Sequence, residues 1–363
     1  MATLSLEHVS KRFGEATVLN DLSLKVEDGE FLVMLGPSGS GKTTCLRLIA
    51  GLEDPDSGSI VLDGQRIVEV APRDRAVAFC RQSYALYPHL TAYENLAFWP
   101  RKRNLPPEDI DRRVNAAAEL VALRELLTRK PRQLTGGQRM RLALARTLVQ
   151  QPKVFLLDEP LFTLDAKLRL QTRPELIKLR RKLGMTVLYA TTDTTEAMSL
   201  GDRIAVLRNG VLQQLDTPQA LYEQPANMFV AGFVGSPAIN FLRSELRTDA
   251  GELVADAGPF QITPPALLAA ALRRLGQPSV YLGIRPQHLY DREWAPSLPN
   301  LQPIRLRVEV VERLGSELIV SCAEGIVARL DARASVRAGD TADLLVDTAQ
   351  LHAFDPITQR AVM

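Results

Sequence analysis

The chain has 363 residues, of which 46% are hydrophobic and 24% charged, and its 44 Lys and Arg nearly balance its 42 Asp and Glu. A chain of this length forms about two domains and buries a substantial core, which excludes disorder as its main character. The net charge of +2 lacks the basic surplus typical of nucleic-acid-binding proteins, so we expect no nucleic-acid partner. The three cysteines are far apart and odd in number, which indicates reduced thiols in the cytosol rather than a disulfide framework.

No part of the sequence predicts a signal peptide or a membrane span. The first ten residues lack a basic region followed by an apolar stretch, and the longest apolar runs, residues 31–35 and 266–272, have the length of core elements. If a membrane is involved, a partner must supply the spans.

The first half of the chain alternates strand-like and helix-like segments. Residues 31–35 form a continuous apolar run, a pattern typical of a strand buried on both faces, and helical spacing of apolar residues begins at Lys42. Two further apolar runs, residues 154–157 and 185–190, follow the helix-like stretches 137–150 and 165–183. This alternation predicts an α/β fold with a parallel sheet covered on both faces, whose ligands lie at the carboxyl ends of the strands.

Beyond about Pro237 the pattern is that of short strands. Apolar and charged residues alternate over residues 304–310, and strand-like pieces recur at 279–284, 318–321, 325–330 and 342–346, separated by Gly, Pro and Asp. We therefore expect a small all-β barrel or sandwich in this part.

A phosphate-binding loop lies between the first buried strand and the helix that follows it. Residues 36–43 read GPSGSGKT and match G-x-x-x-x-G-K-[ST], in which backbone N–H groups and a helix amino end surround phosphate oxygens. The lysine reaches the β and γ phosphates, and the threonine hydroxyl can hold Mg²⁺. A chance glycine-rich turn is the alternative, and the flanking strand and helix disfavour it. The candidate ATP-binding residues are Gly36, Ser38, Gly39, Gly41, Lys42, Thr43 and Thr44.

Two acidic residues end the next buried strand. Asp158 is suited to coordinate Mg²⁺ through water, and Glu159 is suited to polarise the attacking water of phosphoryl transfer. Such a pair is often only a solvated turn, but a phosphate-binding loop upstream favours the catalytic interpretation.

The sequence LTGGQ at residues 134–138 precedes these acids, and together with the phosphate-binding loop and Gln82 it resembles the nucleotide-binding subunits of ABC transporters. Residues 235–242 and 283–289 resemble the carboxyl-terminal extension of the carbohydrate-importer branch, the MalK and UgpC type. The resemblance implies a P-loop NTPase ABC cassette over residues 1–236, with a helical subdomain at about 85–152. A small all-β, OB-like domain for regulation or dimerisation would follow over residues 237–363, with dimer stabilisation alone as an equal alternative.

The same resemblance implies a role for further residues. Phe13 would stack on adenine, unless it is an ordinary core residue near a turn. Gln82 would sense the γ phosphate and Mg²⁺. Residues 83–90, directly after Gln82 and ending at Leu90, would line the groove that receives the coupling helix of the permease, the alternative being a packed surface loop.

The LTGGQ segment is implied to act in trans. Thr135, Gly136, Gly137 and Gln138 would face the nucleotide held by a second ABC subunit, and Asp165 would lie at that interface. The implied partners are thus permease subunits, a second ABC subunit and, indirectly, a periplasmic or extracellular substrate-binding protein. The implied location is peripheral, on the cytoplasmic face of the cell membrane.

One departure from the family pattern falls at the catalytic centre. Thr192 stands where the family has a histidine that bonds the γ phosphate, and no shifted register supplies an imidazole, because the histidines are His8, His89, His288 and His352. A threonine hydroxyl has a shorter reach than an imidazole and carries no positive charge. Lesser departures are Thr135 for serine, Phe162 for a small polar residue, Arg81 for an aromatic, and Pro174, which we expect to kink or shorten its helix.

Three interpretations of Thr192 remain open: a slow homodimer, a heterodimer in which an intact paralogue provides the competent site, and a tolerated change in which Glu159 suffices. We rank the heterodimer first. The predicted function is ATP-driven import of sugars, polyols or glycerol phosphates, with Glu159, Gln82 and Thr192 as catalytic candidates and Thr43, Gln82 and Asp158 at the metal. The alternative is an ATP-binding scaffold whose partner hydrolyses ATP. A soluble ABC protein of DNA repair or translation is disfavoured because the chain has no long coiled-coil insertion or duplicated cassette.

Overall fold

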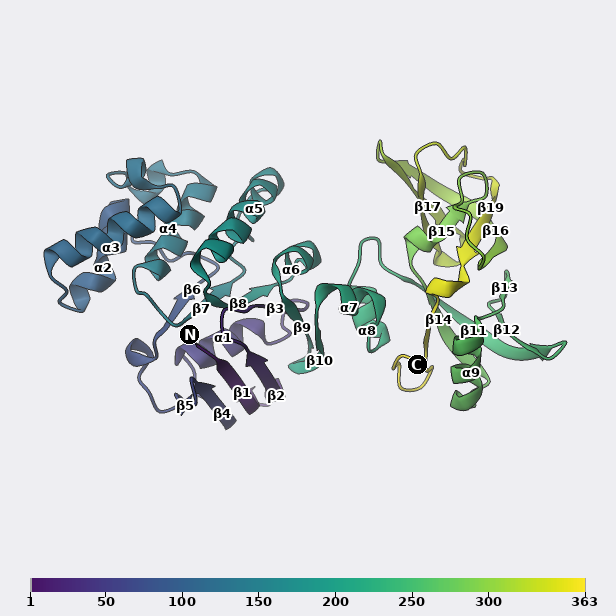
Figure 1. Ribbon diagram of the computed structural model, residues 1–363, viewed down its shortest axis with the longest axis horizontal. Coiled ribbons are helices and arrows are strands. Elements are labelled where there is room, and N and C mark those ends of the chain that lie inside the picture. Colours follow the sequence, from purple (N-terminus) through teal and green to yellow (C-terminus); the bar gives the residue numbers. More distant parts are fainter. Residues whose placement is uncertain (1, 363) are drawn as a thin grey trace. The chain divides into compact units, whose positions relative to one another are not determined.

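The computed structural model describes residues 2–362 and divides the chain into two compact units, Met1–Gln219 and Ala220–Met363 (Figure 1). The division lies before the expected boundary at residues 236 and 237. Residues 220–236 belong with the second unit because the Arg285 side chain donates hydrogen bonds to the carbonyls of Tyr222 and Val234. Asn227 also forms a β-bridge with Arg360.

A six-stranded sheet forms the centre of the first unit, in the order β10-β9-β3-β8-β7-β6. The strands β9, β3, β8, β7 and β6 are parallel, and only β10 is antiparallel to its neighbour. β3, β7 and β8 are buried along their whole length, as the continuous apolar runs predict. The bounds are β3 Phe31–Leu35, β6 Val77–Cys80, β7 Val154–Asp158, β8 Thr186–Thr191, β9 Arg203–Arg208 and β10 Val211–Asp216.

A second, antiparallel sheet lies in the same unit, in the order β2-β1-β4-β5. Its core residues and those of the central sheet belong to one hydrophobic cluster with the buried face of α1. The sequence patterns described above do not predict this sheet. The bounds are β1 Leu4–Phe13, β2 Ala16–Val26, β4 Ser57–Leu62 and β5 Gln65–Arg66.

The helices of the first unit follow the predicted pattern. α5 (Ala166–Leu183) and α6 (Thr194–Leu200) connect strands of the central sheet, and α1 (Lys42–Ala50) leads from β3 of that sheet to β4 of the antiparallel sheet. α2 (Ala92–Lys102), α3 (Pro107–Leu120) and α4 (Gly136–Leu148) gather at one end of the unit around a core of their own (Figure 1). α5 continues through Pro174, so the proline does not shorten this helix, contrary to one of the two expected effects. α7 (Pro218–Glu223) begins in the last two residues of the first unit and continues into the second.

The second unit is built of two five-stranded antiparallel sheets, β13-β12-β11-β14-β20 and β15-β19-β16-β17-β18. In the latter the end strands β15 and β18 contact each other, and one apolar cluster joins both sheets. The bounds are α8 Met228–Phe233, β11 Asn240–Asp249, β12 Glu252–Asp256, β13 Gln261–Ile262, α9 Ala266–Leu275, β14 Ser279–Ile284, β15 Leu289–Asp291, β16 Leu301–Arg313, β17 Glu317–Cys322, β18 Val327–Asp331, β19 Thr341–Asp347 and β20 His352–Phe354.

Two general features complete the fold. Cys45, Cys80 and Cys322 are free and buried. Within the described part of the chain, no helix is both long enough and apolar enough to cross a bilayer.

Candidate nucleotide site

The central sheet brings four sequence-distant segments to one edge. Its register pairs Leu35 of β3 with Thr191 of β8, Ala190 of β8 with Asp158 of β7, and Leu157 of β7 with Cys80 of β6. Because these strands are parallel, the residues that follow them leave the sheet on the same side. The phosphate-binding loop, Glu159, Thr192 and Gln82 therefore share this edge.

The loop between β3 and α1 needs glycine for steric reasons at two positions. A Cβ on Gly36 would lie 2.3 Å from the carbonyl oxygen of Leu207, and Gly41 has a φ of 99° with the Leu19 side chain 2.6 Å from its Cβ position. These glycines let the backbone turn tightly just before α1, whose first N–H groups remain available for an anion. Ser38 and Gly39 at the loop tip are exposed.

The Lys42 side chain folds back over this loop. Its Nζ donates hydrogen bonds to the carbonyls of Gly36 at 2.8 Å and Pro37 at 3.0 Å, and only 5% of the residue is exposed. Burial lowers the pKa of Lys42, while the carboxylates of Glu159 and Asp158 oppose this shift. The ammonium group is thus held inside the loop, where phosphate oxygens are expected to lie.

Thr43 and Asp158 meet at the start of α1. The Thr43 hydroxyl donates a hydrogen bond of 3.0 Å to Asp158 Oδ1, and burial raises the pKa of Asp158 in spite of this bond and the charge of Lys42. Both residues and Gln82 line a hollow of about 490 Å³. No group of three or more His, Cys, Asp or Glu side chains within residues 2–362 is placed to hold a metal ion.

Glu159 and Gln82 face each other across the edge. Gln82 Nε2 lies 3.3 Å from Glu159 Oε2, and Glu159 has a left-handed backbone with φ of 44°. Its N–H donates to the carbonyl of Ala190, which fixes this turn against β8. Burial raises the pKa of Glu159, the Lys42 charge opposes the shift, and the Asp158 charge adds to it. The arrangement gives a half-buried carboxylate beside an amide, both next to the phosphate-binding loop.

Thr192 lies in the turn between β8 and α6 and is half-buried. Among residues 2–362, no hydrogen bond joins its side chain to the protein. Its neighbours are firmly held: the Thr191 hydroxyl donates to Glu196 Oε2 at 2.9 Å, and Asp193 caps α6 by accepting from the Glu196 N–H at 3.0 Å. The turn that carries Thr192 is therefore held by its neighbours on both sides.

The LTGGQ segment forms the start of α4. The Thr135 hydroxyl caps the helix by accepting a hydrogen bond from the Gln138 N–H, and Gln138 Oε1 accepts one from the Thr135 N–H. Gly136 and Gly137 pack against leucines: the Cβ positions of these glycines lie 3.3 Å from Leu164 and 3.2 Å from Leu168. No hydrogen bond within residues 2–362 links Thr135 or Gln138 to residues 36–43.

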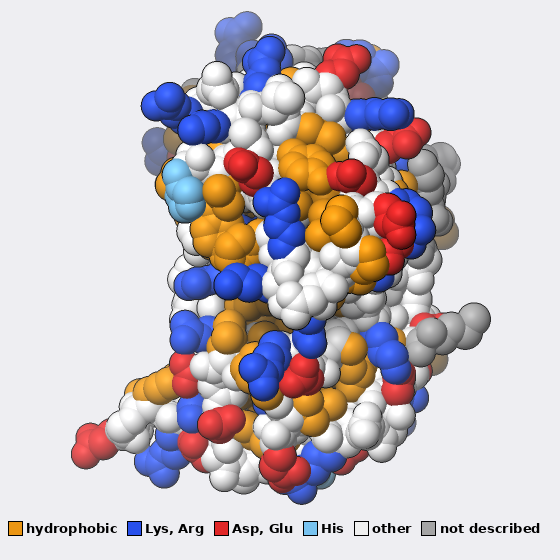
Figure 2. Space-filling view, turned by 90° about the vertical axis from the view of Figure 1, so that its left-hand side faces the viewer, with side chains coloured by type: hydrophobic (Ala, Val, Ile, Leu, Met, Phe, Trp, Pro, Cys, Tyr) orange, Lys and Arg blue, Asp and Glu red, His pale blue; other side chains and the backbone are white. Residues whose placement is uncertain are grey.

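The remaining predicted residues are on the surface or half-buried. Phe13 at the end of β1 is 47% exposed, with the Lys11 ammonium 5.3 Å from its ring centre, so it is not a core residue. Thr44 is half-buried on α1. In the segment after Gln82, Ala85, Pro88 and His89 are exposed. Figure 2 shows hydrophobic side chains gathered between Lys and Arg side chains on the face of the molecule that carries the helical subdomain.

The structure also reveals residues that the sequence motifs did not single out. The Arg146 guanidinium on α4 donates to the carbonyls of Tyr84 at 2.7 Å and Ala85 at 2.6 Å. The Arg169 guanidinium on α5 lies 3.5 Å from Asp193 and donates to the carbonyl of Leu164 at 3.3 Å. Arginine on an amphipathic helix normally indicates a solvated face, so no sequence signal distinguished these two.

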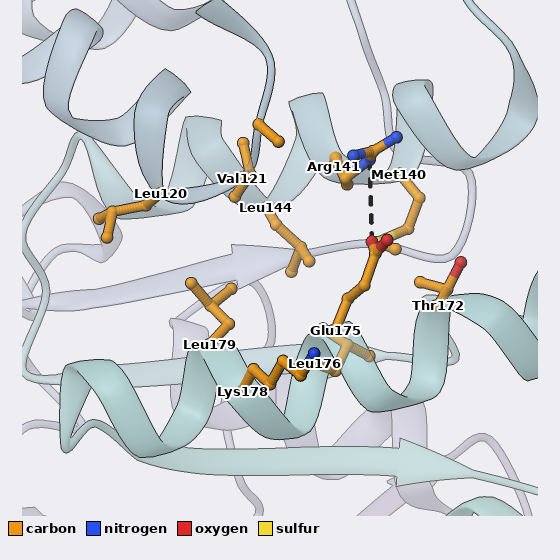
Figure 3. A pocket seen from close by; sticks show the side chains of 11 residues that line it. Leu120, Val121, Met140, Arg141, Leu144, Thr172, Glu175, Leu176, Lys178 and Leu179 are labelled. Atoms are coloured by element: carbon orange, nitrogen blue, oxygen red, sulfur yellow. Dashed lines mark ion pairs between the residues drawn. The ribbon is translucent and has the colours of Figure 1, made fainter.

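A second hollow of about 270 Å³ lies between α4 and α5 (Figure 3). Leu176 and Leu179 of α5 face Met140 and Leu144 of α4, and the Arg141 and Glu175 side chains pair across it at 4.0 Å. Its other lining residues are Leu120, Val121, Ala122, Thr172 and Lys178. None of the predicted site residues lines this hollow, so it is separate from the nucleotide site.

Comparison with known proteins shows which family this chain resembles. Residues 19–162 match the ABC transporter family, and residues 235–289 match the MalK OB fold domain. The chain is 48% identical to the trehalose/maltose import ATP-binding protein MalK of Thermococcus litoralis, with all of both chains covered. It is 42% identical to the trehalose import ATP-binding protein SugC of Mycobacterium tuberculosis, covering 98% of this chain and 97% of the relative.

Another relative and a solved structure agree with this assignment. The chain is 41% identical to the sn-glycerol-3-phosphate import ATP-binding protein UgpC of Bordetella avium, covering 100% of this chain and 99% of the relative. The ATP-binding cassette MJ0796, solved as a dimer in a post-hydrolysis state with ADP and Pi, is 30% identical with a TM-score of 0.53 and covers 59% of this chain and 98% of its own. The chain therefore belongs to the ABC transporter ATP-binding subunits, in the branch of the MalK, SugC and UgpC importer proteins.

Proposed function

We propose that this chain binds Mg-ATP at the loop of residues 36–43 and hydrolyses it to drive an ABC importer. The observation that carries the proposal is the meeting, at one sheet edge, of the buried Lys42 ammonium, the Thr43–Asp158 pair and the Gln82–Glu159 pair. Phosphoryl transfer needs positive charge at the phosphates and a carboxylate that orients water, and both are present here.

Each residue of this edge has a distinct task. Lys42 exchanges its bonds to the carbonyls of Gly36 and Pro37 for phosphate oxygens, and the backbone N–H groups at the start of α1 bind the same anion. Thr43, Gln82 and Asp158 would hold Mg²⁺, which neutralises charge on the phosphates. Glu159 accepts a proton from the attacking water, and the Gln82 amide orients the carboxylate for this step.

The complete site requires a second subunit. Thr135 is exposed and caps the start of α4, and in this proposal Thr135, Gly136, Gly137 and Gln138 face the nucleotide of a partner subunit. Phe162 is 57% exposed beside Asp165, as expected for residues that a partner subunit covers. Phe13 would stack on the adenine ring in its own subunit.

The threonine at position 192 favours a reduced rate of ATP hydrolysis. Its hydroxyl can donate one hydrogen bond to the γ phosphate, but it adds no positive charge where an imidazole would. We therefore expect slow turnover in a homodimer, and we favour a heterodimer in which this chain provides the LTGGQ segment to the competent site of a paralogue. A scaffold subunit that binds ATP and relies on its partner for hydrolysis is the second candidate, and the same residue favours it.

The partners and the cargo follow from the relatives. Their names describe import of trehalose, maltose and sn-glycerol 3-phosphate, so we propose a sugar, polyol or glycerol phosphate as cargo, delivered by a substrate-binding protein outside the membrane. The permease would dock on residues 82–90, where Ala85, Pro88 and His89 are exposed, and would hold the chain at the cytoplasmic face. The domain over residues 237–363 would serve dimerisation or regulation, and the cassette would cover residues 1–236 with its helical subdomain at about 85–152.

One experiment tests the central proposal. ATP turnover by the purified chain is measured with and without Mg²⁺ for the wild type and for Glu159→Gln, together with ATP binding by calorimetry. Mg²⁺-dependent turnover that Glu159→Gln abolishes, with binding retained, supports hydrolysis by this chain. Binding without turnover in the wild type would favour the scaffold instead, and absence of both would refute the nucleotide site.

A further inference from the structure

The loop that carries Gln82 has an unusual backbone. Tyr84 and Ala85 are adjacent non-glycine residues with left-handed φ values of 58° and 47°. Side chains with a Cβ are disfavoured in this region, so two in succession persist only where surrounding contacts hold them. The loop therefore depends on outside contacts for its shape.

Those contacts come from two directions. Arg146 of α4 donates one hydrogen bond to the carbonyl of Tyr84 and one to that of Ala85. The Tyr84 hydroxyl, in turn, reaches the segment after Glu159: it donates to the carbonyl of Pro160 at 2.8 Å and accepts from the Thr163 hydroxyl at 2.8 Å. Only 6% of Tyr84 is exposed, and its hydrogen bond to the Pro160 carbonyl is buried, whereas Thr163 is exposed.

We propose that the Tyr84 hydroxyl is a latch that joins the Gln82 loop to the segment that follows Glu159 and thereby keeps the Gln82 amide aligned with the Glu159 carboxylate. Gln82 is two residues before Tyr84, and Pro160 is the residue after Glu159. The Gln82–Glu159 contact of 3.3 Å is long for a hydrogen bond, so a second attachment nearby determines how well the amide and the carboxylate remain aligned. Tyr84 is thus a positioning residue, and this inference rests on the proposed hydrolysis at Glu159.

The latch also links the two surfaces that the proposed function assigns to partners. Residues 83–90 form the proposed permease-docking loop, and Phe162 and Asp165 lie in the segment proposed for the second subunit. A displacement of the first segment is transmitted to the second through one tyrosine hydroxyl, without passing through the nucleotide. The rigid ring of Tyr84, packed against its surroundings, makes this connection stiff.

The test uses the full chain and removes only hydroxyl groups. Tyr84→Phe keeps the buried ring and deletes both hydrogen bonds, and Thr163→Val deletes one of them. Tyr93→Phe is the matched control, because the Tyr93 hydroxyl bonds Asp111 of α3 and makes no hydrogen bond to the segment after Glu159 in the part of the chain that the structure describes. We expect Tyr84→Phe to lower kcat for ATP by roughly threefold to tenfold with KM unchanged, and Tyr93→Phe to leave both unchanged.

Because both hydroxyls belong to one cluster, the double variant Tyr84→Phe, Thr163→Val should be no slower than Tyr84→Phe alone. Losses that multiply, or an equal change in KM and kcat, would contradict the latch. Melting temperatures of all variants separate a positioning effect from general unfolding, and Thr163→Val remains informative if Tyr84→Phe folds poorly.

Amide hydrogen exchange provides a readout that does not require hydrolysis. The N–H groups of Tyr84 and Ala85 are bonded within one segment, and those of Phe162 and Leu164 within the other. Tyr84→Phe should accelerate exchange in both segments. If Tyr84→Phe accelerates exchange in neither segment, or only in the segment of Tyr84 and Ala85, the latch is refuted whether or not the chain hydrolyses ATP. If exchange accelerates in both segments but the wild type does not turn over ATP, only the proposed hydrolysis is refuted.

Discussion

Gln82 Nε2 lies 3.3 Å from Glu159 Oε2, although 77 residues separate the two in the chain. The contact exists because β6 and β7 are parallel neighbours in the central sheet and both residues follow the carboxyl ends of their strands. It places an amide beside the carboxylate that we propose as the base, and the predictions below concern the groups around this pair.

Removing the Lys42 ammonium should weaken nucleotide binding. Lys42→Gln deletes a buried cation that lies over the phosphate-binding loop, so ATP affinity should fall about 10- to 100-fold, as for the loss of hydrogen bonds to a charged group. Titration calorimetry with ATP measures this. Lys102→Gln, at the exposed end of α2, is the control and should bind like the wild type.

Neutralising Glu159 should stop turnover while sparing binding. Glu159→Gln retains the shape of the side chain but cannot accept a proton, so kcat should fall about 100-fold or more with little change in ATP affinity. Single-turnover kinetics with radiolabelled ATP checks this. A kcat close to that of the wild type would show that another group is the base.

The pH dependence of turnover should reflect the environment of Glu159. Burial raises the pKa of this carboxyl, and only the ionised form accepts a proton. Activity should therefore fall on acidification with a midpoint above that of an ordinary glutamate. The midpoint is read from kcat against pH, with melting temperature monitored over the same range. A midpoint at the ordinary value would contradict the buried setting.

Placing an imidazole at position 192 should accelerate hydrolysis. Thr192→His adds a larger donor to a turn that Asp193 and Glu196 already fix, so kcat should rise by roughly tenfold or more. Thr192→Val is the companion variant and removes the hydroxyl while keeping the side-chain volume. If kcat rises with Thr192→His and falls with Thr192→Val, a hydrogen bond from position 192 contributes to hydrolysis. If kcat changes with neither variant, Glu159 is sufficient for hydrolysis without a donor at position 192.

The second unit should lose stability in mild acid because of His352. Burial, with Arg285 and His288 adding to it, lowers the pKa of His352 from 6.5 to about 4. Between pH 6.5 and about pH 4, His352 is therefore protonated in the unfolded chain but neutral in the folded chain. The free energy of unfolding consequently falls as the pH decreases through this range. Denaturation at pH 7 and pH 5, followed by a probe in residues 220–362, measures the loss. His352→Gln should reduce it, and His8→Gln, at an exposed position, should not.

The sequence alone determined which chemical groups this protein carries. The run of residues 36–43, the strand-end acids Asp158 and Glu159, and the absence of histidine between residues 90 and 287 are properties of residue type and order, so no coordinates are needed to find them. The buried strands were predictable as well, because a strand covered on both faces must be apolar throughout, as β3 and β7 are.

Only the tertiary structure decided which groups meet and what holds them. In the antiparallel sheet, β1–β2 and β4–β5 are hairpins, but the pairing of β1 with β4 joins distant segments, which local patterns of residues do not specify. Tyr84 and Thr163 are ordinary residues by type, and their importance arises from a hydrogen bond between their hydroxyl groups that joins positions 79 residues apart in the chain. Such contacts depend on the parallel register of the central sheet, so they exist only once the strands have assembled.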